Sequence, residues 1–188
     1  MQNLDFSDIS FCGRIAYANC CIEEYITEQG DSPENWKILL HLLWAFPEAE
    51  SMLAYWVIMT DRLPEVILNY DAYHSRDWIG QREFGNEVTE EEFYTLHKLY
   101  AESPLTKFIN EAVWHITNMC GQETDGSHKE AEMIMHQELT PLFRENLKKL
   151  PDIEAFRIFS ISRDVWDRFH TRDEIRLKFL ENPDFQRK

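Results

Sequence analysis

Apolar residues recur at helical spacing along most of the chain. The first such run, over residues 9–29, places its apolar side chains on one face and is followed by Gly30, a residue that commonly ends helices. The face consists of Phe11, Ile15, Ala18, Ile22, Tyr25 and Ile26. Strand signals do not recur, apart from a short stretch at 157–161, and no hairpin turn joins alternating runs. The pattern therefore predicts an all-α protein.

Two consecutive segments are apolar over most of their circumference. Ser32 and Pro33 have the form of a helix start, and the helix they begin is apolar on nearly every side up to Phe46. Pro47 can end that helix and begin the next, in which residues 52–59 again leave little polar face. These two neighbours are expected to be largely buried, central helices.

Further capping signals divide the rest of the chain into about nine helices in total. Starts are expected at Thr89 (a capping box with Glu92), Ser103, Ser127 (a capping box with Glu130), Pro151, Ser162 and Thr171. The helix that begins at Ser127 is expected to be interrupted at Thr140–Pro141, because proline lacks the N–H of a helix interior. We expect one domain over residues 1–188, with any sub-boundary at the polar 121–126 loop.

The charge of the chain is acidic and uneven. The 188 residues carry 34 Asp and Glu against 19 Lys and Arg, a net charge of −15. All of this excess falls in residues 1–126, whereas residues 127–188 hold twelve acidic and twelve basic side chains. Such a field repels nucleic acid and anionic membranes and attracts a basic protein partner. Solubility alone would explain the excess about as well.

The sequence points to a cytoplasmic protein without a membrane segment. The longest nearly apolar stretch, residues 38–46, is far shorter than the roughly 20 residues of a transmembrane helix. The N-terminus lacks the basic and apolar regions of a secretory signal. The four cysteines show no Cys-x-x-Cys spacing and are expected to be reduced thiols of the core.

Residues 69–93 combine aromatic and acidic side chains in a segment longer than a simple connection requires. Aromatic anchors surrounded by one sign of charge are typical of a recognition surface. The predicted partner-binding residues are Tyr70, Asp71, Tyr73, Asp77, Trp78, Glu83, Glu87, Glu90 and Glu91. The alternative is that Trp78 and Phe84 pack into the core and the acids only solvate the turn.

A metal site is the sharpest chemical alternative. His128, Glu132 and His136 follow each other at intervals of four on one helix face. The ends of this row lie about 12 Å apart along a helix, so one ion could bind only an adjacent pair with help from another helix. His115 is the further candidate ligand. The spacing matches neither the His-Glu-x-x-His motif nor the Glu-x-x-His pair of di-iron bundles. The sequence also has no nucleophile, phosphate-loop or dinucleotide motif. We therefore expect no cofactor, and a solvated helix flank is the simpler interpretation of the row.

Four stretches resemble small helical bacterial proteins that act as immunity proteins for secreted polymorphic toxins. They are Trp36 through Leu-Trp-Ala-Phe at 43–46, Leu-Pro-Glu-Val-Ile-Leu at 63–68, Glu-Glu-Phe-Tyr-Thr-Leu-His-Lys-Leu-Tyr at 91–100 and Leu-Pro-Asp-Ile-Glu-Ala-Phe at 150–156. The resemblance implies an inhibitor that binds a toxin domain, often a basic nuclease, and blocks its active site with acidic residues. It transfers no particular binding residue.

Three functions follow from these observations. The first is a non-enzymatic, acidic binding protein of the immunity type. The second is a metal-dependent helical-bundle enzyme that uses His128, Glu132 and His136. The third is a structural subunit whose Trp78 and Trp114 are buried by self-association, although Trp114 is more simply expected to meet a second layer of helices. The oligomeric state stays open.

Overall fold

The computed structural model describes residues 4–45, 52–75, 88–124 and 128–159. Helices account for 77% of these described residues, which contain no strand, so the predicted all-α class is confirmed. Within them the chain forms seven helices when α8 and α9, which are continuous, are counted as one. The predicted number of about nine is therefore not matched.

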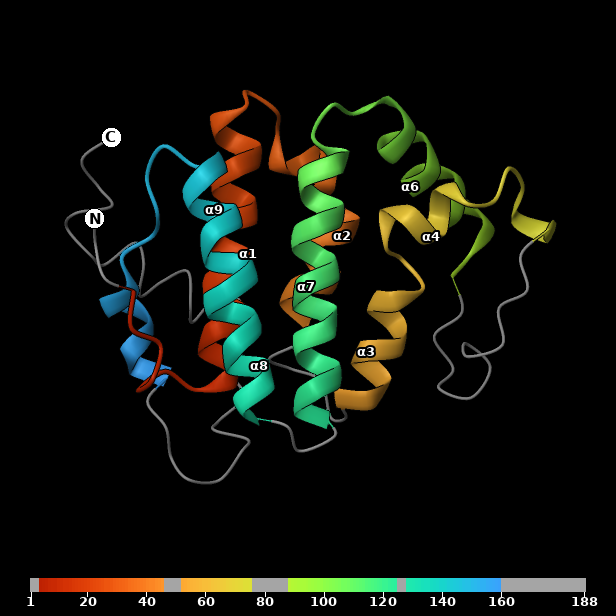
Figure 1. The fold of residues 1–188 in the computed structure, drawn as a ribbon. Helices are drawn as coiled ribbons and strands as arrows, with labels where there is room; N and C mark the ends of the chain where they lie inside the picture. Colours follow the sequence, from red (N-terminus) through yellow and green to blue (C-terminus); the bar gives the residue numbers. More distant parts are fainter. Residues whose placement is uncertain (1–3, 46–51, 76–87, 125–127, 160–188) are drawn as a thin grey trace.

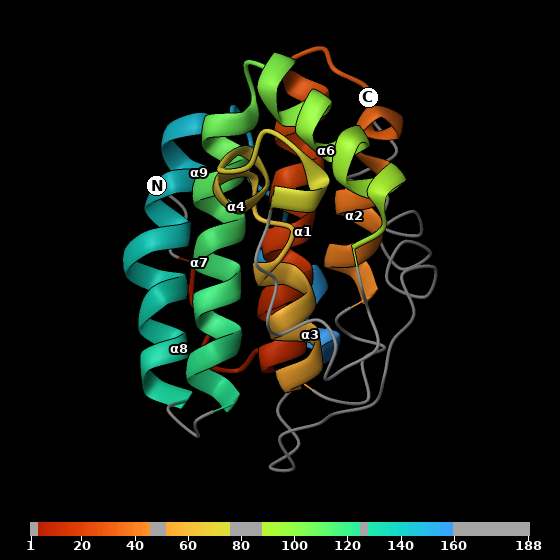
Figure 2. The same ribbon diagram turned by 90° about the vertical axis from the view of Figure 1, so that its right-hand side faces the viewer.

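The helices form a bundle with a smaller pair at one end (Figures 1 and 2). The α-helices are α1 (Phe11–Glu28), α2 (Lys37–Ala45), α3 (Met52–Thr60), α4 (Pro64–Leu68), α6 (Glu90–Glu102), α7 (Thr106–Thr124), α8 (His128–Ile134) and α9 (Thr140–Asn146). Short 3-10 helices are η1 (Pro33–Trp36), η3 (Tyr73–Ser75) and η5 (Ile153–Phe159). The α8–α9 helix runs antiparallel to α7, and α4 packs on α6 at the end of the bundle.

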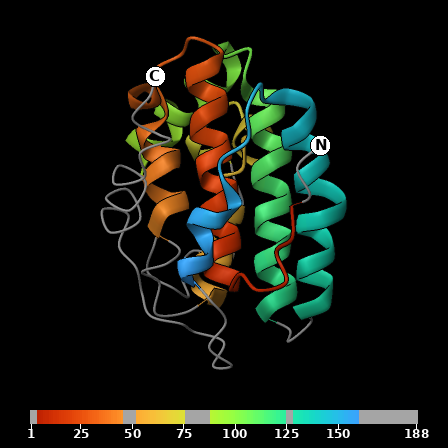
Figure 3. The same ribbon diagram turned by 90° about the vertical axis from the view of Figure 1, so that its left-hand side faces the viewer.

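The most buried helix is α1. Its N-terminus is capped by Ser10, whose hydroxyl accepts a hydrogen bond from the N–H of Gly13 at 3.2 Å. Every residue from 13 to 19 is buried, and Figure 3 shows α1 between α2 and α7. The N-terminal segment and η5 cover its remaining side: the ring of Tyr17 contacts Phe6 and Phe156, each at a centroid distance of 5.1 Å.

The two helices predicted to be central are less buried than α1. In α2, Lys37 and His41 are exposed, on the narrow polar strip that the sequence places there. In α3, the side chains described are those of residues 56–60, and of these only Met59 is buried. The reason is tertiary: α1, whose sequence is amphipathic, gains cover from segments distant in the chain, whereas α2 and α3 lie nearer the edge of the bundle.

The predicted interruption at Thr140–Pro141 is instead a continuous helix with one wide turn. Residues Met135–Leu139 are π-helical, and the carbonyl of Met135 accepts both the N–H of Thr140 and its hydroxyl, the latter at 2.7 Å. Pro141 offers no N–H to the carbonyl of Gln137 and would collide with it in a regular α-helix. The wide turn moves that carbonyl away, so the helix continues to Asn146.

The predicted loop at 121–126 is largely helical. Residues up to Thr124 belong to α7, and residues 125–127 lie outside the described part of the chain. Gly121 allows α3 to approach α7 closely, because a Cβ at this position would lie 3.3 Å from Nε1 of Trp56. A single hydrophobic core joins buried residues from Leu4 to Phe156, on both sides of the expected sub-boundary.

The other predicted helix starts have mixed outcomes. The segment after Pro151 is the 3-10 helix η5 rather than an α-helix, and it includes residues 157–159 of the stretch that could have been a strand. The starts at Ser127, Ser162 and Thr171 lie outside the described residues. No helix in the described ranges is long and apolar enough to cross a membrane.

All four cysteines lie in the described part of the chain as thiols, two of them buried and two half-buried. Cys21 and Cys120 are the buried pair. Burial raises the pKa of the Cys21 thiol well above its usual value. Because the thiolate is the reactive form, Cys21 is an inert part of the core.

Candidate functional site

The structure describes about half of the predicted partner-binding residues. Tyr70, Asp71, Tyr73, Glu90 and Glu91 are described, whereas Asp77, Trp78, Glu83 and Glu87 lie in residues 76–87, outside the described ranges. The described members come from η3, the segment before it, and the first turn of α6. These elements lie beside α4 at one end of the bundle (Figure 2).

Tyr70 and Tyr73 are half-buried packing residues rather than free anchors. The hydroxyl of Tyr73 donates a hydrogen bond to the carbonyl of Val88 at 2.9 Å. Its ring meets the edge of the Phe93 ring at a centroid distance of 5.9 Å. Tyr70 packs against the main core. Both aromatic rings therefore pack toward the core. The alternative stated for Trp78 and Phe84 falls on residues outside the described ranges.

Tyr94 is an exposed aromatic residue at this end of the bundle that is not among the predicted binding residues. Its side chain is 45% exposed on α6, beside Phe93, which is buried. The Tyr94 hydroxyl accepts the backbone N–H of Tyr73 at 3.5 Å, which places it next to η3. The signal was present in the sequence, since position 94 falls off the apolar face that Phe93, Leu96 and Tyr100 form.

Acidic side chains lie on the same elements as Tyr94 and its contact in η3. Glu90 and Glu91 are exposed in the first turn of α6, and Asp71 is exposed just before η3. His74 lies 3.9 Å from Glu90, measured from Nε2 to Oε1. We call this set, Asp71, His74, Glu90, Glu91 and Tyr94, the acidic α6 surface. Part of its charge also stabilises α6, because acidic groups are favourable at a helix N-terminus.

Glu92 is not part of this surface, because its carboxylate binds Arg62 beneath it. Thr89 caps α6 by accepting the N–H of Glu92 at 3.1 Å, as half of the predicted capping box. The Glu92 carboxylate does not complete the box, because it accepts hydrogen bonds from Arg62 at 2.6 and 3.2 Å. The hydroxyl of Tyr100 donates a second hydrogen bond from α6, to the carbonyl of Arg62 at 3.1 Å. Together, the Arg62–Glu92 ion pair and this hydrogen bond hold α6 against the turn between α3 and α4.

In the predicted metal row, Glu132 has two neighbours, His136 of the row and Arg14 of α1. Glu132 lies 3.7 Å from His136, so one adjacent pair of the row does meet. Glu132 also lies 3.9 Å from the largely buried guanidinium of Arg14. A cation of the protein thus already occupies one side of the carboxylate. The described residues contain no group of three or more His, Cys, Asp or Glu side chains able to hold a metal ion.

The other members of the metal hypothesis are His128, the ring of His136 and His115. His128 begins α8, and its side chain is outside the described set. The ring of His136 packs against Phe6 at a centroid distance of 5.6 Å. His115 is half-buried on α7. The arrangement fits the interpretation of the row as a flank of the helix better than it fits a metal centre.

Trp114 departs from its expected place. Its side chain is 40% exposed on α7, so no helix of the described ranges fully covers it. Trp78, its proposed companion in self-association, lies outside the described residues.

Comparison with known proteins gives no relative for this arrangement. The chain matches no known protein family, no curated protein and no solved structure.

Proposed function

We propose that the protein is a non-enzymatic, acidic binding protein, most concretely an immunity-type inhibitor that neutralises a basic toxin domain in the cytoplasm. The acidic α6 surface is the observation that carries the proposal. It combines an exposed aromatic side chain, Tyr94, with the carboxylates of Asp71, Glu90 and Glu91. An aromatic anchor supplies buried contact area, and carboxylates around it select and steer a basic partner.

The position and charge balance of the surface support the same proposal. It lies in the two thirds of the chain that hold the entire acidic excess. Neither Asp71 nor Glu91 makes an ion pair with another described side chain. Among the described side chains, no cation therefore neutralises these two carboxylates.

Affinity capture from the native bacterium's lysate tests the proposal. We expect the tagged protein to retain one basic protein at low salt and to release it at high salt, because electrostatic association weakens as salt screens the charges. Co-expression of the captured protein with and without the inhibitor then measures neutralisation directly. Capture of only acidic or neutral proteins, insensitive to salt, contradicts the proposal.

Charge reversal locates the binding surface. The double variant Glu90→Lys with Glu91→Lys is expected to weaken the complex by about tenfold or more. The matched control, Glu102→Lys with Glu145→Lys, makes the same change in net charge at exposed positions of α6 and α9 outside the surface. Equal weakening by both variants would show that net charge alone, and not this surface, attracts the partner.

The metal-dependent enzyme stays as the alternative function, favoured only by the Glu132–His136 contact of 3.7 Å. It predicts stoichiometric metal in protein purified without chelator and a higher melting temperature on addition of zinc or manganese. The same preparation used for capture serves for this measurement. Absence of both effects eliminates the alternative.

A further inference from the structure

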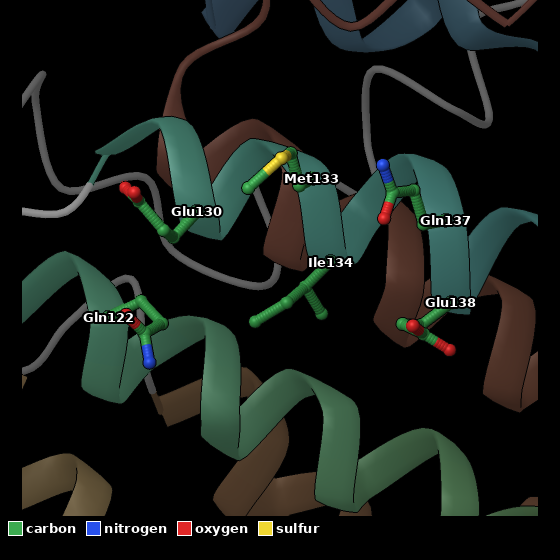
Figure 4. A pocket seen from close by; sticks show the side chains of 6 residues that line it. All are labelled: Gln122, Glu130, Met133, Ile134, Gln137 and Glu138. Atoms are coloured by element: carbon green, nitrogen blue, oxygen red, sulfur yellow. The ribbon is translucent and has the colours of Figure 1, made fainter.

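A groove between α7 and the α8–α9 helix has an apolar floor and acidic ends. Figure 4 shows Ile134 pointing from α8 toward α7, with Met133 beside it and Glu130 and Glu138 on either side along the helix. Gln122 of α7 and Gln137 complete the lining of this open hollow of about 250 Å³. The groove lies on different helices from the acidic α6 surface.

The apolar part of the groove is unusually accessible. Met133 is 46% exposed, and Ile134 is half-buried. An unbranched thioether adapts to different apolar partners, and for this reason exposed methionines are common on peptide-binding surfaces. The π turn that follows carries Gln137 and Glu138, so this irregular backbone forms one end of the groove.

The charges of the groove indicate what would occupy it. Both charged residues that line the groove in the described part of the chain, Glu130 and Glu138, are acidic and exposed. The two positions are eight apart in the sequence, or about 12 Å along a helix axis. A single cation cannot reach both carboxylates, so a complementary segment would carry two basic side chains with an apolar residue between them.

We propose that this groove binds a basic, amphipathic helical segment of another protein. A leucine-sized side chain of the segment packs on Met133 and Ile134, and a Lys or Arg on each side pairs with Glu130 and Glu138. The mode is that of an amphipathic helix in a groove, where apolar anchors give contact and charged rims set the orientation. A second copy of this chain is disfavoured there, because its own groove brings two further carboxylates.

A synthetic peptide of leucine and lysine, about three helical turns long, serves as the probe. Binding is measured by fluorescence anisotropy. We expect Glu130→Lys with Glu138→Lys to weaken binding by about tenfold or more. The charge-matched control Glu102→Lys with Glu145→Lys should weaken it by about threefold at most, through the general field. A peptide with serine in place of leucine should bind weakly, and the double variant Glu130→Lys with Glu138→Lys should change its affinity no more than the control variant does.

Methyl NMR shows where the peptide binds. In protein labelled at the methionine methyl groups, the Met133 signal, assigned from Met133→Gln, should shift on addition of the peptide, while the signals of buried Met59 and Met119 stay in place. Equal effects of the two double variants, or an unmoved Met133 signal, overturn the proposal. A Met133 signal that shifts with protein concentration alone would identify a second copy as the occupant and would also overturn it.

The test is independent of the proposed inhibitor function. Glu90→Lys with Glu91→Lys should leave the Met133 shift intact, because these residues lie on α6 and do not line the groove. Failure of the groove experiment therefore leaves the acidic α6 surface untouched, and the reverse also holds.

Discussion

At the scale of residues, polar side chains that bond to buried groups hold the ends of helices in place. Asp31, after α1, accepts hydrogen bonds from the indole N–H of Trp36 at 2.8 Å and from Asn35 at 2.7 Å. Trp36 is fully buried, so its N–H needs this acceptor. Arg62 has the same role between α3 and α6, where its pair with Glu92 is largely shielded from solvent. The Asp31–Trp36 contact is local, whereas the Arg62–Glu92 contact connects segments that the sequence alone leaves separate.

Removal of the acceptor at position 31 should destabilise the protein. Asp31→Ala leaves the buried indole N–H unsatisfied, so we expect the free energy of unfolding to fall by about 1–3 kcal/mol in urea denaturation. Asp31→Asn retains an acceptor oxygen and should lose less. A loss from Asp31→Asn as large as that from Asp31→Ala would contradict the hydrogen-bond explanation.

The same residue gives a prediction for pH. The hydrogen bond from Trp36, with those from Asn35 and Ser32, lowers the pKa of Asp31 below its ordinary value of 3.8. A lowered pKa in the folded state means that this contribution to stability is present above the ordinary value and is lost as pH falls through the lowered one. Unfolding measured below about pH 4 should therefore depend less steeply on pH in Asp31→Asn than in the wild type.

Loss of one partner of the shielded ion pair should be costly. Arg62→Met leaves the Glu92 carboxylate without its cation, and we expect a loss of about 3 kcal/mol in the free energy of unfolding. The control is Lys37→Met, which removes the exposed pair with Glu34 and should change stability by about 0.5 kcal/mol or less. Similar values for the two variants would show that the Arg62 pair is not shielded.

At the scale of elements, the N-terminal cap of α6 holds the helix turn that carries part of the proposed binding surface. Thr89 satisfies the N–H of Glu92, and the Glu92 side chain, which a complete capping box would use, is engaged by Arg62. The cap is therefore one-sided. Its loss should both weaken the fold and loosen the first turn, where Glu90 and Glu91 lie.

Thr89→Ala tests this cap. We expect it to lower the free energy of unfolding by about 1 kcal/mol. Thr95→Ala, also in α6, removes only a hydroxyl that bonds back to the carbonyl of Glu91, and it should be neutral or slightly stabilising. Hydrogen exchange of the first amides of α6 should accelerate in Thr89→Ala alone. Equal exchange in both variants would place the control of this turn elsewhere.

At the scale of the whole molecule, the net charge of −15 is a source of self-repulsion. Among described residues, most ion pairs are exposed or local in sequence and offset little of it. We expect the melting temperature to rise as salt is added from low to moderate ionic strength, because screening weakens the repulsion. In Glu102→Lys with Glu145→Lys the rise should be smaller. A melting temperature independent of salt would mean that the acidic side chains do not repel one another appreciably.

The sequence by itself determined the helical class and most of the individual buried faces. The apolar face predicted for α1 is buried except at Tyr25, which is half-buried, because helical spacing places these side chains on one side of the helix. Caps at Ser32, Thr89 and Ser103 were also readable, since each is a local bond between a hydroxyl and a nearby N–H.

Only the tertiary structure decided which helix is central and which aromatic residues face solvent. Cover over α1 comes from Phe6 and Phe156, which lie far apart in the chain, and local periodicity holds no information about such contacts. Tyr73 turns inward because Val88 and Phe93 lie beside it, whereas Tyr94 and Trp114 stay exposed because no described element covers them. The helix likewise continues through Pro141 only because of the π turn at Met135–Leu139. Burial of Met135 and Leu139 in the core holds this turn in place.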